Sequence, residues 1–203
     1  MNEIRKNKTV GFFILAAGRC ERFGAPKFLF PYEGMPLLKR LLEKCLIVEP
    51  EHTYIITGAY HKEIASKVEN GRLIYNPKYS EGMASSIRLV SEKATELELE
   101  AIVLILSDQP FVNDYMLRML INRFNEGYDI VSFEKNGEPC PPSLFSRRYY
   151  KALAELKGDT GAKKIIKEAK RKEVIRGFDH LLEDFDNVWD YLRLTSEDPL
   201  KRS

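Results

Sequence analysis

The sequence predicts an α/β fold: a Rossmann-like, mostly parallel sheet with helices on both faces. Short apolar runs alternate with amphipathic stretches along most of the chain. The runs are almost continuously apolar, which is typical of parallel strands buried on both faces. The stretches between them carry apolar residues every three or four positions, as helices with one buried side do. This alternation favours a sheet held between two layers of helices.

The apolar runs indicate where the strands lie. The first ends in the small residues Ala16, Ala17 and Gly18, and the second is closed by Gly58. Together the runs predict strands over Val10–Ala16, Thr53–Thr57, Arg72–Tyr75, Ala101–Leu106, Tyr128–Phe133 and Glu173–Gly177.

Helices are predicted between the strands and toward the C-terminus. In the first, Leu38, Leu41 and Cys45 belong to one apolar stripe, and Pro36 suits its first turn, where no backbone N–H is needed. The predicted helices are Pro36–Leu46, Lys62–Val68, Met83–Leu97, Asn113–Asn125, Arg147–Leu156, Thr160–Lys170 and a short one from about 187 to 194.

One segment, Glu134–Pro142, predicts a loop. It carries Gly137 and the prolines Pro139, Pro141 and Pro142. Proline donates no hydrogen bond to a ladder, so the composition argues against a central strand here.

Length and composition favour one soluble domain. The 203 residues are 44% hydrophobic, which provides a substantial core and excludes disorder as the main state. We expect a single domain over residues 1–203, with 1–8 and 196–203 as frayed tails.

Charge and cysteine usage exclude several classes of protein. Lysine and arginine number 32 against 30 acids, so bulk charge supports neither a nucleic-acid nor a membrane partner. Apolar runs are far shorter than the ~20 residues of a membrane helix, and the start does not resemble a signal peptide, so a cytoplasmic location is expected. Three cysteines without CxxC spacing predict neither a disulfide framework nor a zinc site.

Candidate ligand-binding residues follow the strands. Ligands bind at the carboxyl ends of strands in open α/β sheets. After the first strand, Arg19, Arg22 and Lys27 could surround a polyphosphate, although a solvent-exposed basic turn is an equal alternative. After the fourth, Asp108 could hold Mg²⁺ together with substrate phosphates, the alternative being an N-cap of the next helix.

Three further segments carry polar residues near helix starts. Ser85 and Ser86 lie near a predicted helix N-terminus, where they would bind a polar ligand or simply cap the helix. Gly158–Lys164 predicts another start, capped by Asp159 or Thr160, with a phosphate-facing role as the alternative. Asp184 and Asp186 share one side of an extended segment, or form a solvated acidic turn.

Taken in order, six segments resemble the MobA-like nucleotidyltransferases, and most closely the molybdenum cofactor cytidylyltransferase branch. The first matches the family pattern L-A-A-G-x-S-x-R-M-G-x-x-K. The segments are Leu15–Gly18 with Arg22, Gly24 and Lys27, then Gly34–Leu38, Gly82–Ser86, Asp108–Pro110, Gly158–Lys163 and Asp184–Asn187.

The resemblance implies a fold of the nucleotide-diphospho-sugar transferase type. It implies a reaction that moves CMP from CTP to the terminal phosphate of molybdopterin and releases pyrophosphate. Lys27, Arg22 and Asp108 would be catalytic, and Asp108 and Asp186 would hold Mg²⁺, or Mn²⁺ in its place. The nucleotide-binding residues would be Leu15, Ala16, Ala17, Gly18, Arg19, Arg22, Lys27, Gly82, Ser85 and Ser86.

The choice of nucleotide and acceptor depends on few residues. Cytidylyl members resemble this chain in having Ala17, where guanylyl members have glycine. Departures from the family pattern are Cys20, Phe23, Cys140–Pro142 and Asn187–Trp189; Cys20 is either a small apolar substitute or a redox-sensitive thiol. The alternatives are transfer from GTP or another nucleotide to a different phosphorylated acceptor, and a non-catalytic nucleotide carrier. A molybdoenzyme or its chaperone is the expected protein partner.

Overall fold

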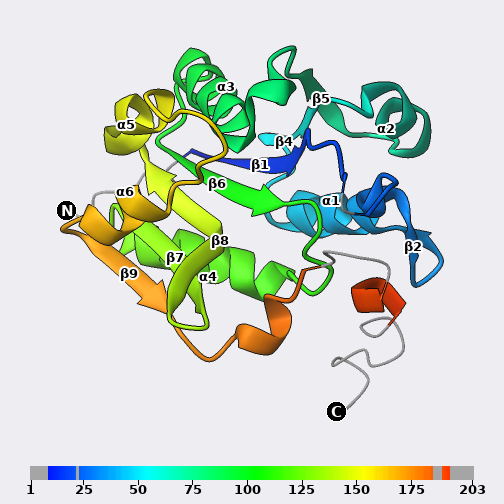
Figure 1. The fold of residues 1–203 in the computed structure, drawn as a ribbon. Helices are drawn as coiled ribbons and strands as arrows, with labels where there is room; N and C mark the ends of the chain where they lie inside the picture. Colours follow the sequence, from blue (N-terminus) through cyan, green and yellow to red (C-terminus); the bar gives the residue numbers. More distant parts are fainter. Residues whose placement is uncertain (1–8, 22, 185–188, 193–203) are drawn as a thin grey trace.

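The computed structural model describes residues 9–21, 23–184 and 189–192, which form a sheet covered by helices (Figure 1). The seven strands follow the order β5-β4-β1-β6-β8-β7-β9, and only β8 runs antiparallel to its neighbours. The mostly parallel α/β fold is therefore confirmed. The strands are β1 (Val10–Ala16), β4 (Thr53–Thr57), β5 (Arg72–Tyr75), β6 (Ala101–Leu106), β7 (Ile130–Lys135), β8 (Glu138–Ser146) and β9 (Lys172–Ile175).

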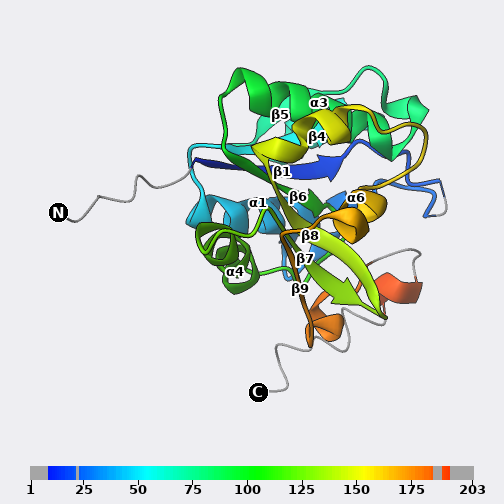
Figure 2. The same ribbon diagram turned by 90° about the vertical axis from the view of Figure 1, so that its left-hand side faces the viewer.

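Helices cover both faces of the sheet, as Figures 1 and 2 show from two sides. One face packs on α1, α2 and α4, and the other on α3, α5 and α6. A small two-stranded sheet, β2 (Pro31–Tyr32) with β3 (Met35–Pro36), precedes α1. The helices are α1 (Leu37–Val48), α2 (His61–Lys67), α3 (Met83–Glu96), α4 (Asp114–Asn125), α5 (Tyr150–Ala154) and α6 (Lys163–Glu168), with 3₁₀ turns η1 (Lys27–Leu29), η2 (Tyr79–Glu81), η3 (Arg147–Tyr149) and η4 (Asp179–Leu181).

Strand β1, in the interior of the sheet, shows why the chain folds this way. Phe12 and Ile14 join the core under α1 and α4, while Phe13 joins the core under α3 and α5. All three are fully buried. A strand that buries both faces needs apolar residues at every position, which is the pattern of this run.

Most predicted element boundaries agree with the structure to within a few residues. Pro36 is an exception, because it precedes α1 and belongs to β3 instead of lying in the first helical turn. The helix predicted over Thr160–Lys170 shortens to α6, and the one over Arg147–Leu156 begins as a 3₁₀ turn. Of the helix expected near 187–194, only 189–192 lie within the described residues, and these are helical.

The predicted loop over Glu134–Pro142 is wrong, because most of it belongs to β7 and β8. Strand β8 pairs with β6 only from Ser143 onward, so its proline-bearing half has a neighbour on one side alone, β7. The register with β7 shifts between Ser132 and Phe133, where Pro141 and Pro142 lie opposite the irregularity. Proline is compatible with an edge position and a bulge.

Strand order places a topological switch beside β1. The chain proceeds from β1 outward through β4 and β5, then returns to pair β6 with the other side of β1. Leu15 pairs with Leu106, and the N–H of Ser107 donates to the carbonyl of Leu15 at 3.3 Å. The carboxyl ends of β1 and β6 thus lie side by side, at the position where open α/β sheets bind ligands.

The structure also bears on the state of the cysteines and on membrane-spanning helices. Cys20, Cys45 and Cys140 are all free thiols. Among the described residues, no helix has both the length and the apolar character needed to cross a membrane.

Candidate nucleotide-binding site

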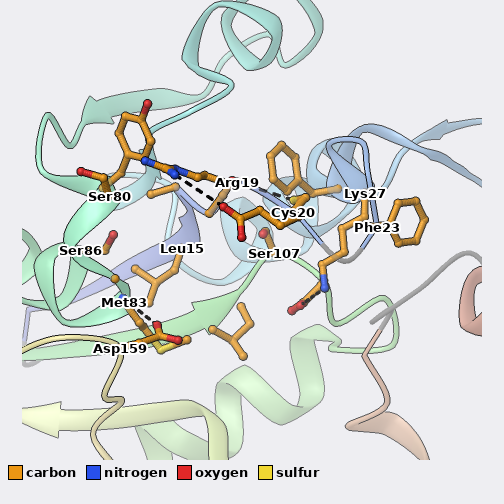
Figure 3. Close-up of a pocket in the computed structure, with 18 of the residues that line it drawn as sticks. Leu15, Arg19, Cys20, Phe23, Lys27, Ser80, Met83, Ser86, Ser107 and Asp159 are labelled. Atoms are coloured by element: carbon orange, nitrogen blue, oxygen red, sulfur yellow. Dashed lines mark hydrogen bonds and ion pairs between the residues drawn. The ribbon is translucent and has the colours of Figure 1, made fainter.

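A cavity of about 600 Å³ opens at the switch between β1 and β6 (Figure 3). The loop after β1, the start of η1, the turn η2 with the first residues of α3, and the residues after β6 form its wall. Its lining residues are Leu15, Ala17, Gly18, Arg19, Cys20, Glu21, Phe23, Lys27, Phe28, Tyr79, Ser80, Glu81, Gly82, Met83, Ser86, Leu106, Ser107, Asp108 and Asp159.

The loop after β1 is folded by its own backbone. The N–H groups of Phe23 and Gly24 both donate to the carbonyl of Cys20, at 3.0 and 2.9 Å. Cys20 itself has a φ of +52°, so the chain reverses direction there. The reversal brings Lys27 back toward the carboxyl end of β6, which is the first step in assembling the site.

Lys27 and Asp108, which both line the cavity, form an ion pair. Lys27 Nζ lies 2.7 Å from Asp108 Oδ2, and the two side chains are only 13% and 19% exposed. The other oxygen, Asp108 Oδ1, is buried and has no hydrogen-bond partner among the described residues. An acceptor left without a partner is costly, so this oxygen is disposed to take a cation or a donor from a ligand.

The environment of Asp108 opposes its negative charge. Burial raises the pKa of the Asp108 carboxyl, Lys27 lowers it through charge and hydrogen bonding, and the charge of Asp184 raises it again. The net direction is upward, because loss of solvent outweighs the attraction of Lys27. A further positive charge at the site would stabilise the carboxylate.

Asp108 is not a helix cap. Helix α4 begins six residues later at Asp114, and Asn113 caps it by accepting from the N–H of Met116 at 3.0 Å. The alternative interpretation from the sequence is therefore wrong. Asp108 lies in the cavity wall, where its charge has no role in starting a helix.

Arg19 supplies a second cation to the cavity lining and is labelled in the upper part of Figure 3. Its guanidinium lies 5.8 Å from the centre of the Tyr79 ring and 3.6 Å from Glu21 Oε1. Arg22, the third cation predicted for this loop, lies outside the described residues.

The start of α3 forms the opposite end of the cavity. The N–H of Met83 donates to Asp159 Oδ1 at 3.2 Å, and the N–H of Ala84 donates to the carbonyl of Gly158 at 3.2 Å. Asp159 thus caps α3, which lies 76 residues away in sequence, and the prediction that Asp159 or Thr160 caps the helix after them is wrong. Helix α6 begins at Lys163 without a side-chain cap.

Of the predicted nucleotide-binding residues that the structure describes, which exclude Arg22, most line the cavity and two do not. Leu15, Ala17, Gly18, Arg19, Lys27, Gly82 and Ser86 line the cavity. Ala16 does not, because its side chain is buried in the core on the α1 side of the sheet. Ser85 is also buried away from it, where it accepts from Asn76 Nδ2 at 2.9 Å and donates to the Gly82 carbonyl at 2.8 Å.

The acidic segment near the C-terminus is described only up to Asp184. Asp184 Oδ1 lies 2.8 Å from Lys135 Nζ, with Glu183 at 3.7 Å from the same nitrogen. Burial alone would lower the pKa of Lys135, but the bond to Asp184 and the charges of both acids raise it. Asp186, the predicted second metal ligand, lies outside the described residues. Within the described part of the chain, no group of three or more His, Cys, Asp or Glu side chains could hold a metal ion.

The sequence did not predict that Tyr79 and Glu81 line the cavity. It also did not predict that Asp159 lines the cavity beside α3. Tyr79 and Glu81 belong to a 3₁₀ turn with no distinctive pattern. The sequence indicated that the Gly-Asp-Thr-Gly segment around Asp159 starts a helix or faces a phosphate. Its contact with α3 could not be predicted, because that contact depends on tertiary structure.

Comparison with known proteins gives consistent matches. The sequence model of the MobA-like NTP transferase domain matches residues 12–174. Purine catabolism protein PucB of Bacillus subtilis is 27% identical over 176 residues, which cover 81% of this chain and 83% of PucB. The crystal structure of Rv0371c from Mycobacterium tuberculosis superposes with a TM-score of 0.80 at 26% identity, covering 94% of this chain and 99% of that one. A manganese complex of Rv0371C superposes with a TM-score of 0.76 at 24% identity, covering 93% and 99%.

Proposed function

Because the chain belongs to the MobA-like NTP transferase family, and so is a nucleotidyltransferase, we propose that it is a Mg²⁺-dependent cytidylyltransferase acting on a molybdopterin-type acceptor. The terminal phosphate oxygen of the acceptor attacks the α-phosphorus of CTP. A new P–O bond forms there, the bond to the β-phosphate oxygen breaks, and pyrophosphate leaves. The attacking group is the acceptor's own phosphate, so the protein needs no covalent nucleophile.

The observation that carries this proposal is the Lys27–Asp108 pair that lines the cavity at the β1–β6 switch. Phosphoryl-type transfer depends mainly on positioning and on stabilising negative charge. The ammonium of Lys27 would stabilise the charge that develops around the α-phosphate, where a preorganised cation is worth far more than in water. Arg19, which also lines the cavity, would play the same role toward the outer phosphates.

Asp108 fits a divalent cation. Its Oδ1 is buried without a partner among the described residues, and carboxylate oxygens together with substrate phosphates are the usual ligands of Mg²⁺. Asp186 is the second ligand that we propose, and the manganese complex of the M. tuberculosis relative supports a divalent metal. When bound, the ion supplies positive charge to the phosphates of both substrates.

CTP is the nucleotide that we propose, on the basis of Ala17. Its side chain lines the cavity, where a methyl group narrows the space compared with glycine. A GTP-dependent enzyme with another phosphorylated acceptor is the second candidate, since one methyl group is a small basis for choosing a base. A carrier without catalysis is less compatible, because binding alone does not require a cation paired with a buried carboxylate.

Pyrophosphate release tests the proposal. Purified protein is incubated with CTP, GTP or UTP, with Mg²⁺ or Mn²⁺, and with or without molybdopterin. We expect release with CTP and acceptor together, and its loss in Asp108→Ala. Asp114→Ala is a matched control, because this aspartate lies in an exposed pair with Arg118 on α4. Release driven by GTP would overturn the choice of nucleotide, and binding of nucleotide without release under any condition would favour the carrier.

A further inference from the structure

The two ends of the cavity differ in the polar groups that line them. Lys27 and Phe23 lie at one end and Asp159, Met83 and Ser86 at the other, as Figure 3 shows. The first end carries Lys27, a cation suited to phosphates, and the guanidinium of Arg19 lies over the Tyr79 ring in the turn before α3. The second offers oxygen atoms that accept hydrogen bonds, and this suits the neutral nucleoside part of a nucleotide.

The start of α3 is not available to phosphates. A helix N-terminus attracts anions through backbone N–H groups that lack partners. Here the first three are engaged, with Met83 donating to Asp159, Ala84 to Gly158 and Ser85 to Gly82. The nucleoside is therefore the part of the ligand expected beside α3.

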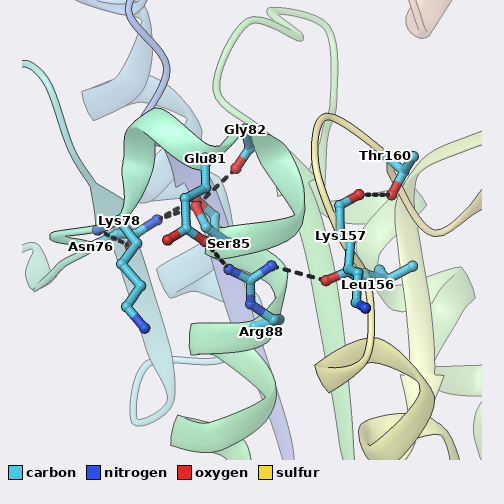
Figure 4. Close-up of polar contacts among 10 residues, drawn as sticks. Asn76, Lys78, Glu81, Gly82, Ser85, Arg88, Leu156, Lys157 and Thr160 are labelled. Carbon is cyan, nitrogen blue, oxygen red and sulfur yellow. Dashed lines mark hydrogen bonds and ion pairs between the residues drawn. The ribbon is translucent and has the colours of Figure 1, made fainter.

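The loop that carries Asp159 packs closely against this helix. Gly82 has a φ of +93°, and a Cβ there would lie 2.8 Å from the Gly158 carbonyl oxygen, so the two backbones are in direct contact. Arg88 adds a second attachment: it donates to the Leu156 carbonyl at 2.9 Å and pairs with Glu81, as Figure 4 shows. Asp159 Oδ1 is fixed by the N–H of Met83, and among the described residues Oδ2 has no hydrogen-bond partner.

We propose that Asp159 is a specificity-determining residue whose Oδ2 accepts a hydrogen bond from the exocyclic amino group of the bound base. Cytosine carries that amino group and uracil carries a carbonyl oxygen in its place. A carboxylate attracts the amino group of cytosine and repels the carbonyl oxygen of uracil, so this contact would favour CTP over UTP. This inference rests on the proposed function and extends it to the group that recognises the base.

The variant Asp159→Asn separates base recognition from the structural role. Asparagine caps helices as well as aspartate does, so its Oδ1 can still accept from Met83. The other position changes from an acceptor to an NH₂ donor. The fold and the cap are kept, while the group that faces the ligand changes from a hydrogen-bond acceptor to a hydrogen-bond donor.

The test is the ratio of the dissociation constants of CTP and UTP, measured by isothermal titration with Mg²⁺. The wild type should prefer CTP by about tenfold, as expected for one hydrogen bond to a charged group at an exposed residue. Asp159→Asn should lose or reverse this preference with an unchanged melting temperature. Asp159→Ala should bind the two nucleotides about equally and melt lower, because it loses the cap as well.

Other outcomes separate this inference from the proposed function. Equal weakening of CTP and UTP in Asp159→Asn, with a changed preference for CTP over dCTP, assigns the residue to the ribose and overturns the inference. Equal binding of CTP and UTP by the wild type overturns it without any variant. If the wild type binds no nucleotide at all, the proposed function fails, and this inference fails with it.

Discussion

Replacing Gly82 with alanine tests how the nucleoside end of the cavity is built. Gly82 precedes α3 with a φ of +93° and a ψ of −176°. This backbone region is essentially restricted to glycine. A methyl group would also point into the backbone of the loop that carries Asp159.

The cost of this substitution follows from the geometry. An alanine forced into this region costs ~1–3 kcal/mol. Its Cβ would lie 2.8 Å from the Gly158 carbonyl oxygen and 2.9 Å from the Asp159 nitrogen, both backbone atoms that cannot swing aside. Such overpacking costs a further ~1–3 kcal/mol, so we expect a loss of ~2–6 kcal/mol in the free energy of unfolding. Relief is obtained only if the 158–159 loop moves away from α3 and gives up its two hydrogen bonds.

Urea unfolding and CTP titration of two variants measure the effect. The control is Gly137→Ala in the turn between β7 and β8, where φ is +79° but nothing lies within 4 Å of the added Cβ. The control should lose only about 1 kcal/mol of stability and bind CTP normally. Gly82→Ala should lose more stability and bind CTP more weakly. Equal destabilisation of the two variants would refute the close contact between Gly82 and the Asp159 loop.

Three further predictions concern Asp108, Lys27 and Cys20. Burial raises the pKa of Asp108 above its ordinary 3.8, so the folded chain holds this proton more tightly than the unfolded chain. The measured quantity is the free energy of unfolding of the wild type minus that of Asp108→Asn, in metal-free buffer. This difference should therefore be greatest below about pH 4 and should fall as the pH rises through the raised pKa of Asp108. A difference that increases with pH would contradict the raised pKa. Lys27→Met should lower kcat by about 10²–10³-fold in the pyrophosphate assay, since it removes a preorganised charge, and an unchanged kcat would exclude Lys27 from catalysis. Burial also raises the pKa of the Cys20 thiol, so iodoacetamide should alkylate this cysteine slowly at pH 7. Bound CTP should slow the alkylation further, because Cys20 lines the cavity. If mass spectrometry shows the same rate of alkylation with and without CTP, the nucleotide binds elsewhere.

The sheet was largely predictable because its strands are buried on both faces. In β1, Phe12 and Phe13 enter opposite cores, so burial alone requires a continuous apolar run, and such runs are visible in sequence. Strand β8 was not predictable by the same argument. Its first half contains Pro139, Pro141 and Pro142, and only its place beside β7 at an irregular register makes those prolines acceptable.

The site was predictable where a residue directly follows a buried strand. Asp108 follows β6, and parallel strands bring their carboxyl ends together, which placed it near the loop that carries Lys27. Asp159 was assigned to the wrong helix, because capping patterns are recognised between neighbours in sequence and this cap joins residues 76 positions apart. Ser85 resembled a ligand-binding hydroxyl, but its partner Asn76 is brought to it by the fold.

Titration of CTP into the protein, with Mg²⁺ and then with EDTA, tests most directly whether this cavity holds a nucleotide through Asp108. The wild type should bind CTP in Mg²⁺ and lose most of that affinity in EDTA. Asp108→Ala should bind at least about tenfold more weakly in Mg²⁺ and show little further loss in EDTA, whereas Asp114→Ala should match the wild type. Equal, Mg²⁺-independent binding by the wild type and Asp108→Ala would contradict the assignment of this site.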